Sequence, residues 1–411
     1  MGGYHGQRLA MKIAVVTQIF PTREQPYRGH SVYQTLLHLN KSARVKIYSP
    51  HPEYPSWFLP RSRAWAKTDP SYSPEHLDTH YFSYRALPFF SRPANGFVCA
   101  RKLERLLRKN PPDVILNYWL YPDGFAAVRA GRKLGIPVVV KAIGSDFNEP
   151  HDPISSALIQ YVLRRAAKVL TVSDHLRVKI IESGIAPAKI FAVPNGCDSS
   201  VFHLADREKA RRDLGITPES QLIVYVGRSD FAKGLRELLE ATSCLARDYP
   251  RLQVAMVGEG PAREELMKVA ESLGIKDRVI FVPPCPSLEV ARWMTAATIC
   301  TLPSYREGYP NVILEALSCG RPVVATTVGG IPEIAKGDCA ILVPPQDAVA
   351  LAEGIRSALN RSWNPVDIAH RTRRGWEDVA RETFDICAAA IRESSPGFTT
   401  SVVEPGVADH G

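Results

Sequence analysis

Residues 298–327, TICTLPSYREGYPNVILEALSCGRPVVATT, contain the pattern that decides the fold. Two short apolar runs, at 298–303 and 322–327, are bounded by turn residues and predict strands. The stretch between them turns at a glycine and a proline and then predicts a helix over 310–319. A strand, a helix and a second strand joined in this way form a parallel βα unit. We therefore expect an α/β fold with parallel sheets.

The same alternation continues along the chain in two separate series. The first series predicts strands at 12–19, 43–49, 113–119, 137–143, 168–173 and 189–194. The second predicts strands at 222–227, 253–258, 279–283, 298–303, 322–327 and 340–344. Turn-rich residues 194–208 separate the two series, which indicates two doubly wound domains instead of one large sheet.

The predicted organisation follows from these series. We expect a Rossmann-like domain at 11–200, a second at 205–365, a helical segment at 366–393 and a flexible tail at 394–411. In open parallel sheets, ligands bind beyond the carboxyl ends of the strands. Two such domains facing each other would hold a ligand in the cleft between them.

Composition places the chain among ordinary globular proteins. It has 411 residues, of which 45% are hydrophobic and 23% charged. No apolar run approaches the roughly 18 residues of a membrane span. The first residues lack the apolar core of a signal peptide, so we expect the protein to begin near here, at Met1 or Met11. The eight cysteines include no CxxC pair and are expected to be buried free thiols in a reducing cytosol.

Charge is distributed unevenly along the chain. Residues 1–203 carry 27 Lys and Arg against 14 Asp and Glu, a balance of +13, whereas residues 204–411 carry 24 against 28, a balance of −4. One domain is therefore expected to meet an anionic surface or substrate. No basic stripe alternates with stacking aromatics, so we expect no nucleic acid partner. Residues 57–65, 81–92 and 97–109 are rich in basic and aromatic side chains, which indicates either a patch that binds anionic membrane or a solvated helix face.

Several common motifs are missing from the sequence. There is no P-loop, no GxGxxG after a strand and no GxSxG. There is also no DxD, the carboxylate pair that would present a metal-bound nucleotide diphosphate. We therefore predict no metal site.

Two glutamates lie in the deciding stretch, eight residues apart. Glu307 falls in a turn after a strand, and Pro310 is expected at the first position of the following helix. The free backbone N–H groups of Asn311 and Val312 would then form a seat for phosphate. Glu315 lies one turn after Asn311 and can accept both hydroxyls of a ribose, while Glu307 can reach another polyol.

Two further loops combine glycine with features that bind anions. In GRSDFAKG (227–234), Arg228 and Lys233 lie at the carboxyl end of a strand, where two cations can neutralise a diphosphate without a metal. In PTREQPYRGHSVYQ (21–34), Gly29 permits close approach of the backbone. Ser31 and Gln34 are expected to form a capping box that opens a helix.

These residues together carry a resemblance to a known family. EGYPNVILEALSCGRPVVAT (307–326) and GRSDFAKG resemble the E-x7-E and G-R…K-G signatures of retaining glycosyltransferase family 4, whose members have the GT-B fold. PYRG, YPDG and GSDFN, at 26–29, 121–124 and 144–148, are most similar to members that build bacterial exopolysaccharide and teichuronic-acid-type polymers. Further matches lie at VSDHLRVKI (172–180), VPNGCDSSVF (193–202), VGEGP (257–261) and TTVGGIPEI (326–334). With them, the resemblance covers roughly residues 11–390.

The resemblance implies a role for each matching position. Arg228 and Lys233 would bind the diphosphate of a nucleotide-sugar donor, Glu315 its ribose and Glu307 the sugar hydroxyls. It also implies backbone contacts from Asn311 and Val312, a place for Gly29 against the phosphates, and an approach of Asp146 to the transferred sugar or the acceptor. Enzymes of this family need no divalent metal and no other cofactor. They retain the anomeric configuration, with the leaving phosphate oxygen taking the proton of the acceptor.

The chain departs from the family pattern on the acceptor side. Tyr118 stands where a histidine is expected, Ile143 where an arginine or histidine is common, and His30 where a small or apolar residue is common. These departures indicate an altered acceptor or a degraded activity.

We accordingly expect transfer of a sugar from a nucleotide diphosphate to a glycan or polyprenyl-linked acceptor, in polysaccharide biosynthesis for the cell envelope. The enzyme would be cytoplasmic, with a peripheral place on the inner face of the cytoplasmic membrane as a further option. Two alternatives remain. One is a nucleotide-sugar epimerase of the same architecture, and the other is a non-catalytic protein that binds sugar nucleotides or glycans.

Overall fold

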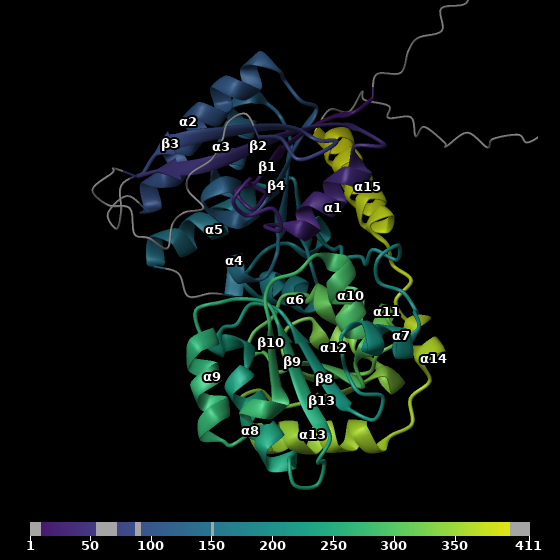
Figure 1. Cartoon of the computed structure of the whole chain (residues 1–411). Helices are drawn as coiled ribbons and strands as arrows, with labels where there is room; N and C mark the ends of the chain where they lie inside the picture. Colours follow the sequence, from purple (N-terminus) through teal and green to yellow (C-terminus); the bar gives the residue numbers. More distant parts are fainter. Residues whose placement is uncertain (1–9, 55–71, 87–91, 149–151, 395–411) are drawn as a thin grey trace, which may run out of the picture. The chain divides into compact units, whose positions relative to one another are not determined.

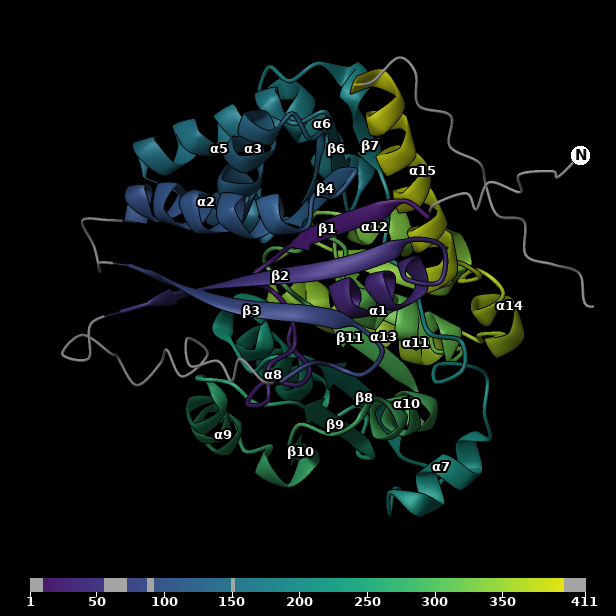
Figure 2. The ribbon, with the colours of Figure 1, turned by 90° about the horizontal axis from the view of Figure 1, so that it is seen from above.

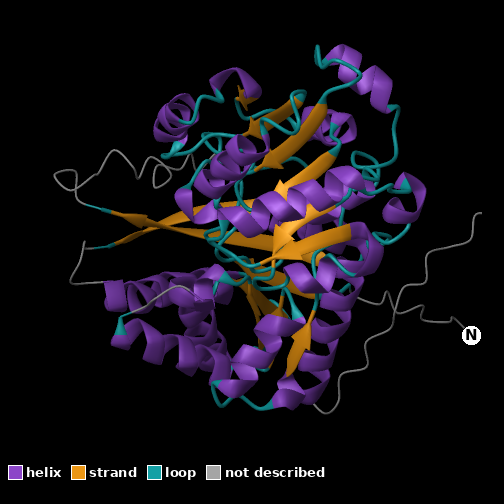
Figure 3. Cartoon of the chain, turned by 90° about the horizontal axis from the view of Figure 1, so that it is seen from below, coloured by secondary structure: helices purple, strands orange, loops and turns teal. Residues whose placement is uncertain are grey.

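The computed structural model describes residues 10–54, 72–86, 92–148 and 152–394, which form two compact units (Figure 1). Among these residues, unit 1 comprises 10–172, 177–194 and 376–394, and unit 2 comprises 173–176 and 195–375. Each unit contains one fully parallel sheet with helices on both of its faces (Figure 3). The expectation of two Rossmann-like α/β domains is confirmed.

Unit 1 is built on a seven-stranded sheet in the order β3-β2-β1-β4-β5-β6-β7. The order reverses at β1, whose neighbours are β2 on one side and β4 on the other. Its strands are β1 (Lys12–Val16), β2 (Arg44–Glu53), β3 (Asp78–Arg85), β4 (Val114–Tyr118), β5 (Val138–Ala142), β6 (Lys168–Thr171) and β7 (Ile190–Ala192).

Two helical layers cover this sheet. Helices α2 (Arg92–Lys109), α3 (Phe125–Leu134) and α5 (Pro153–Arg165) pack together on one face (Figure 2). Helices α1 (His30–Leu39) and α15 (Trp376–Ser394) pack on the other. The remaining helices are short or lie at the end of the unit: η3 (Leu120–Gly124), α4 (Ser145–Asn148), α6 (Asp174–Glu182) and η4 (Pro187–Lys189).

Strand β3 is an element that the sequence analysis did not predict. Its aromatic side chains Tyr81, Phe82 and Tyr84 are buried, and the strand pairs with β2 from Asp78 to Arg85. The interpretation of residues 81–92 as part of a membrane patch is therefore wrong for Tyr81, Phe82 and Tyr84, because these aromatic side chains are buried in the unit. Residues 57–65 and 87–91 of that patch lie outside the described residues.

Strand β2 runs to Glu53, four residues beyond its predicted end. The predicted strand ended at Ser49, directly before Pro50, and proline cannot donate to a ladder. Beyond Tyr48, however, β2 is paired with β3 alone, since the ladder with β1 ends there. A strand with one unpaired side tolerates proline.

Unit 2 is built on a six-stranded sheet in the order β10-β9-β8-β11-β12-β13. Helices α8 and α13 pack together on one face with α9, and α10, α11 and α14 pack on the other. The strands are β8 (Gln221–Val226), β9 (Leu252–Val257), β10 (Val279–Val282), β11 (Ile299–Leu302), β12 (Val323–Thr326) and β13 (Ala340–Val343). The helices are α7 (Arg207–Asp213), η5 (Phe231–Lys233), α8 (Leu235–Leu245), α9 (Arg263–Ser272), η6 (Lys276–Arg278), α10 (Ser287–Ala296), α11 (Asn311–Ser318), α12 (Ile331–Ile334), η7 (Gly337–Cys339), α13 (Ala348–Asn360) and α14 (Pro365–Ala369).

The segment expected as one helical stretch at 366–393 is divided between the units. Helix α14 belongs to unit 2, whereas α15 belongs to unit 1. The apolar face of α15, including Val379, Cys387 and Ile391, is buried in the core that Val15 and Leu36 also share. This long amphipathic helix thus completes one helical layer of the first sheet. Apart from Ser394, the predicted tail lies outside the described residues.

Two predictions about composition can be checked against the structure. All eight cysteines are free thiols, as expected, although Cys244 is exposed and Cys285 is only partly buried. Within the part of the chain that the structure describes, no helix combines the length and apolar character needed to cross a membrane.

Candidate active site

The topology of unit 2 brings the predicted donor-binding loops to one edge of its sheet. Strand β8 lies between β9 and β11, and the chain reverses its direction of winding between β8 and β11. Ligands of open parallel sheets bind beyond the carboxyl ends of the strands at such a point. Arg228 and Lys233 follow β8, and Glu307 follows β11, so the three predicted residues flank this switch point.

An ion pair joins the two loops across the switch point. Lys233 Nζ donates to Glu307 Oε1 at 2.7 Å. The side chains are only 28% and 12% exposed, respectively, so the pair is better shielded from solvent than a surface ion pair. An ammonium has three donors, and Lys233 therefore keeps N–H groups for a second anionic partner.

Two glycines allow these loops to approach each other closely. Gly234 has φ 68°, and a Cβ at this position would overlap the carbonyl oxygen of Pro303. Gly329 has φ 56°, and a Cβ there would overlap the carbonyl oxygen of Glu307. The N–H of Gly330 donates to Gly308 O at 2.9 Å. The loop after β12 therefore supports the Glu307 turn from behind, a role that the sequence analysis did not assign to TTVGGIPEI.

Arg228 takes a more open position. Its side chain is 68% exposed, and Nη2 donates to Asp230 at 2.7 Å. The loop itself is well held, because Tyr225 Oη donates to Arg228 O at 2.8 Å and Ser229 N donates to Glu259 O at 3.0 Å. To meet an anion, the exposed guanidinium would turn from Asp230 while its backbone stays in place.

Helix α11 begins beside Glu307. Pro310 is the N-cap residue, with φ −75° and ψ 115°, so the prediction that it occupies the first helical position is wrong by one residue. Asn311 and Val312 are then the first helical residues, and among the described residues no acceptor takes their backbone N–H groups. Asn195 Nδ2 donates to Asn311 Oδ1 at 2.8 Å. Asn195 was not predicted as a site residue, although VPNG was part of the resemblance.

Glu315 lies one turn into the same helix. Its carboxyl is partly buried, and desolvation raises its pKa to about 7. Asn311 and Glu315 are four residues apart, so their side chains share one face of α11. A carboxylate of this kind gains from hydroxyl donors, because each donor favours its charged form.

The predicted site residues of unit 1 lie in loops at the carboxyl edge of its own sheet. Gly29 is the N-cap of α1 with φ 65°, and a Cβ there would overlap Ile19 O. The predicted capping box is wrong, because α1 has no side-chain cap, and Ser31 O accepts instead from Thr35 Oγ1 at 2.8 Å. The close backbone approach expected at Gly29 is present, but it is made to Ile19.

Asp146 is buried, and backbone groups surround its carboxylate. Oδ1 accepts from the N–H groups of Ile143 and Gly144, both at 3.0 Å, and Oδ2 accepts from Leu120 N at 3.1 Å. Burial raises its pKa to about 6 against the opposing effect of these hydrogen bonds. These hydrogen bonds hold together the loops after β4 and β5. The approach of Asp146 to the transferred sugar or the acceptor stays a prediction.

A second buried carboxylate, Asp123, was not predicted as a site residue. Gln18 N donates to its Oδ2 at 2.5 Å, which ties the loop after β4 to the loop after β1. Burial raises its pKa to about 8. The YPDG stretch was quoted for the resemblance, but no role had been given to its aspartate.

Two of the three departures from the family pattern, Tyr118 and Ile143, have structural explanations. Tyr118 is 1% exposed and belongs to the hydrophobic core of unit 1, with its ring 5.9 Å from Lys141 Nζ. It therefore contributes to the packing of unit 1. Ile143 packs against the same core through its side chain.

Comparison with known proteins agrees with this arrangement. A family model for glycosyl transferases group 1 matches residues 206–375, and a glycosyl transferase 4-like domain matches residues 30–196. The D-inositol 3-phosphate glycosyltransferase 1 of Catenulispora acidiphila is 32% identical over 304 residues, which are 67% of this chain and 71% of that protein. This chain is a group 1 glycosyltransferase. The resemblance drawn from the motifs is thereby confirmed.

Other relatives of the glycosyltransferase extend the comparison. A putative teichuronic acid biosynthesis glycosyltransferase of Bacillus subtilis, TuaC, is 29% identical over 367 residues, 86% of this chain and 91% of that protein. Sucrose-phosphate synthase from Thermosynechococcus elongatus has a TM-score of 0.78 at 20% identity, covering 93% of this chain and all of that one (100%). Anabaena HepE, solved with UDP and glucose, has a TM-score of 0.72 at 19% identity, covering 92% and 100%. These likenesses show that the glycosyltransferase has the GT-B fold.

Proposed function

We propose that this glycosyltransferase transfers a sugar from a nucleotide diphosphate, without a divalent metal and with retention of anomeric configuration, to a glycan or polyprenyl-linked acceptor. The observation that carries the proposal is the Lys233–Glu307 ion pair at the switch point of unit 2. The pair holds a cation and a carboxylate side by side, which supports a role for Lys233 at the diphosphate and for Glu307 at the sugar hydroxyls. The same proposed site includes the backbone N–H groups at the start of α11 and the Glu315 carboxyl, which we assign to binding of the nucleotide.

The proposed binding mode divides the donor among these groups. The diphosphate would take the free N–H groups of Lys233, the guanidinium of Arg228 and the start of α11, where the helix dipole favours negative charge. The ribose hydroxyls would donate to Glu315. Glu307, held in place by Gly329 and by its pair with Lys233, would accept from hydroxyls of the transferred sugar.

The roles of Lys233 and Arg228 in the proposed reaction depend on where negative charge develops. The acceptor hydroxyl forms a bond to the anomeric carbon as the bond from that carbon to the β-phosphate oxygen breaks. In a retaining front-face reaction, the departing phosphate oxygen takes the hydroxyl proton. Negative charge therefore increases on the diphosphate, where Lys233 and Arg228 stabilise it most strongly in the transition state.

The acceptor class is proposed from the relatives and from charge. The similarity to a putative teichuronic acid biosynthesis enzyme supports a role in polysaccharide assembly for the cell envelope. The excess of basic residues in 1–203 favours an anionic acceptor. A polyprenyl-linked acceptor would bring the enzyme to the cytoplasmic face of the membrane.

A thermal-shift screen of UDP-, GDP- and ADP-sugars tests the donor. A correct donor at about 100 times its Kd should stabilise the protein by about 2.7 kcal/mol, which corresponds to roughly 5–10 °C for a unit of this size. Lys233→Gln should abolish the shift, whereas Lys268→Gln, which changes an exposed lysine of α9, should preserve it. The absence of any shift with all three donor classes would contradict the proposal.

Activity with the stabilising donor separates the proposal from its alternatives. Transfer to an acceptor, with the α or β configuration of the donor preserved in the product by NMR, is the expected outcome. Release of free nucleotide diphosphate without any acceptor would favour an epimerase. Donor binding with neither transfer nor release would indicate a non-catalytic binding protein.

A further inference from the structure

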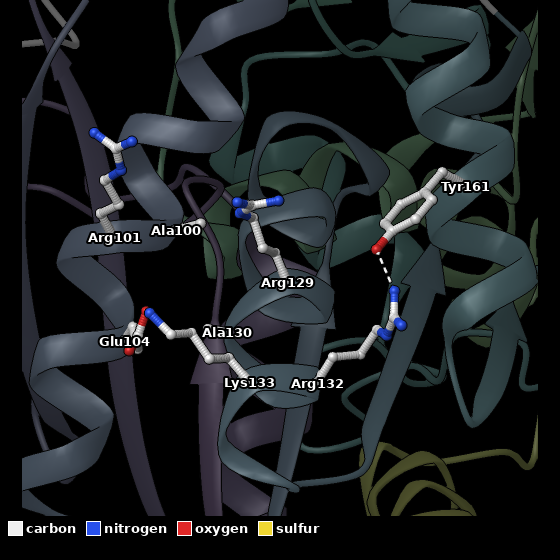
Figure 4. Close-up of a pocket in the computed structure, with 8 residues that line it drawn as sticks. All are labelled: Ala100, Arg101, Glu104, Arg129, Ala130, Arg132, Lys133 and Tyr161. Atoms are coloured by element: carbon white, nitrogen blue, oxygen red, sulfur yellow. Dashed lines mark hydrogen bonds and ion pairs between the residues drawn. The ribbon is translucent and has the colours of Figure 1, made fainter.

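Unit 1 contains a cavity of about 490 Å³ in its outer helical layer (Figure 4). It lies where α2, α3 and α5 pack together, and its volume falls within the range of roughly 300–1,000 Å³ that is typical of small-molecule sites. The side chains that decide its chemistry are Arg101 and Glu104 from α2, Arg129, Arg132 and Lys133 from α3, and Tyr161 from α5. No part of the proposed donor site contributes to it.

The charges around this cavity are not balanced. Glu104 accepts from Arg108 at 2.8 Å and from Lys133 at 3.0 Å, and these hydrogen bonds lower its pKa. Its negative charge is therefore already engaged by two cations. In the described structure, no carboxylate lies within ion-pair distance of the three arginines that line the cavity, Arg101, Arg129 and Arg132.

The three guanidiniums have no charged partner among the described residues: those of Arg132 and Arg129 contact neutral aromatic side chains, and that of Arg101 has no partner there. Arg132 Nη1 donates to Tyr161 Oη at 2.8 Å, and the guanidinium carbon of Arg129 lies 5.1 Å from the centre of the Phe97 ring. Arg101 makes no hydrogen bond or ion pair with the described residues and is exposed. In Figure 4, the Arg101 and Arg129 side chains come from different helices and both point toward the upper part of the view. Their N–H groups are thus available to a ligand.

The chemistry of the lining indicates the class of ligand. A guanidinium presents a planar fork of donors that matches a carboxylate or a phosphate group. Three such groups around one hollow favour a ligand that carries several anionic groups and enters the hollow, in contrast to a flat lipid surface. The concave shape also concentrates the positive potential.

The position of the cavity links it to the acceptor side. Helix α3 begins at Phe125, directly after the η3 turn that contains Asp123, and Arg129 lies about 6 Å further along its axis at 1.5 Å per residue. Arg129 therefore lies about one helical turn from the end of α3 that follows the carboxyl end of β4. We propose that the cavity is a distal acceptor subsite, which binds a carboxylate- or phosphate-bearing part of an acidic glycan through Arg101, Arg129 and Arg132. This inference rests on the proposed transfer function.

The test compares two double variants of the full chain. Arg101→Gln with Arg129→Gln removes two positive charges from the cavity. Arg105→Gln with Lys109→Gln removes the same charge from exposed positions of α2 that do not line it. Binding of octagalacturonate, an acidic octasaccharide, is measured by isothermal titration calorimetry at low and moderate salt, with the neutral maltooctaose as the comparison ligand.

We expect the parent to bind octagalacturonate and not maltooctaose. The cavity variant should raise the Kd at least tenfold, and the control variant should change it by less than threefold. Equal loss in both variants would overturn the proposal in favour of general charge attraction. Binding to vesicles containing phosphatidylglycerol that depends on Arg101 and Arg129, without octagalacturonate binding, would overturn it in favour of a membrane contact.

Two further measurements keep the result interpretable. Arg101→Gln alone removes no contact with the described residues, so it should fold as the parent does and still weaken octagalacturonate binding. The donor thermal shift should be unchanged in every variant. If every variant binds octagalacturonate as the parent does and the donor thermal shift is intact, the subsite is refuted and the proposed function stands. Absence of a donor shift in the parent would instead refute the proposed function.

Discussion

The buried carboxyl of Glu315 leads to a prediction about stability as well as donor binding. Its pKa rises from the ordinary value of 4.5 to about 7, because burial disfavours the charged form. At pH 8 the ligand-free protein must therefore hold an ionised carboxylate in a poorly solvated place. Glu315→Gln removes this charge while it preserves the approximate size and shape of the side chain, so we expect the variant to be more stable than the parent at pH 8.

The size of the effect follows from the shift in pKa. A shift from 4.5 to about 7 corresponds to about 3 kcal/mol, and partial solvent access reduces the expected gain to about 2–3 kcal/mol. The folded state binds the proton more tightly than the unfolded state, so the parent loses stability as pH rises from 4.5 to about 7 and then levels off. The advantage of the variant should grow over the same range and disappear toward pH 4.5.

Thermal unfolding between pH 5 and pH 8 measures this difference. A gain of about 2–3 kcal/mol should raise the midpoint by roughly 4–10 °C at pH 8 for a unit of this size. Glu264→Gln, which removes the same charge from an exposed position of α9, is the matched control and should shift little at any pH. The argument would be refuted if Glu315→Gln were less stable than the parent at pH 8. It would also be refuted if the variant gained the same stability over the parent at every pH. The variant should also lose most of its stabilisation by nucleotide, since the amide is a weaker acceptor for the ribose hydroxyls.

Four further predictions concern the reaction and its supporting residues. Glu307→Gln should lower kcat on the order of 10²-fold, because the transferred sugar is misplaced, while the Kd for nucleotide stays within threefold of the parent value. A parallel loss of nucleotide affinity would reverse the assignments of Glu307 and Glu315. Gly329→Ala should lower both the unfolding midpoint and the rate of transfer, because Gly329 has φ 56° and an added Cβ would overlap Glu307 O. Parental values of both would contradict the role of Gly329 in supporting the Glu307 turn. Transfer should persist in excess EDTA, and rescue by magnesium after inhibition would show a metal requirement. Nucleotide binding near pH 6.5 should release a fraction of a proton, detectable as a buffer-dependent binding enthalpy, because hydroxyl donors lower the pKa of Glu315.

Much of the proposed donor site could be predicted from local sequence. Glu307 and Glu315 were found because a strand, a turn and a helix start follow one another within 30 residues, 298–327. Arg228 and Lys233 were found because they follow a strand at a glycine-rich loop. The ion pair between Lys233 and Glu307 was not predicted, since the partners are 74 residues apart and meet only because β8 and β11 are neighbours.

The predicted residues of unit 1 were less predictable for the same physical reason. Asp146 and Tyr118 have ordinary sequence surroundings, and only the packed structure shows that backbone N–H groups surround one and that the core encloses the other. The cavity lined by arginines likewise draws residues from three helices that are separate in the sequence.

The sequence by itself determined the α/β class, the two strand series, the glycine-rich loops and the family, because hydrophobic period and turn chemistry depend on residues close together in the chain. Only the tertiary structure decided that α15 returns to the first sheet, that β3 forms its edge and that Lys233 pairs with Glu307. It also decided the burial that raises the pKa of Glu315. Burial and charge pairing depend on which distant segments meet, and a pKa depends on the water that those segments exclude.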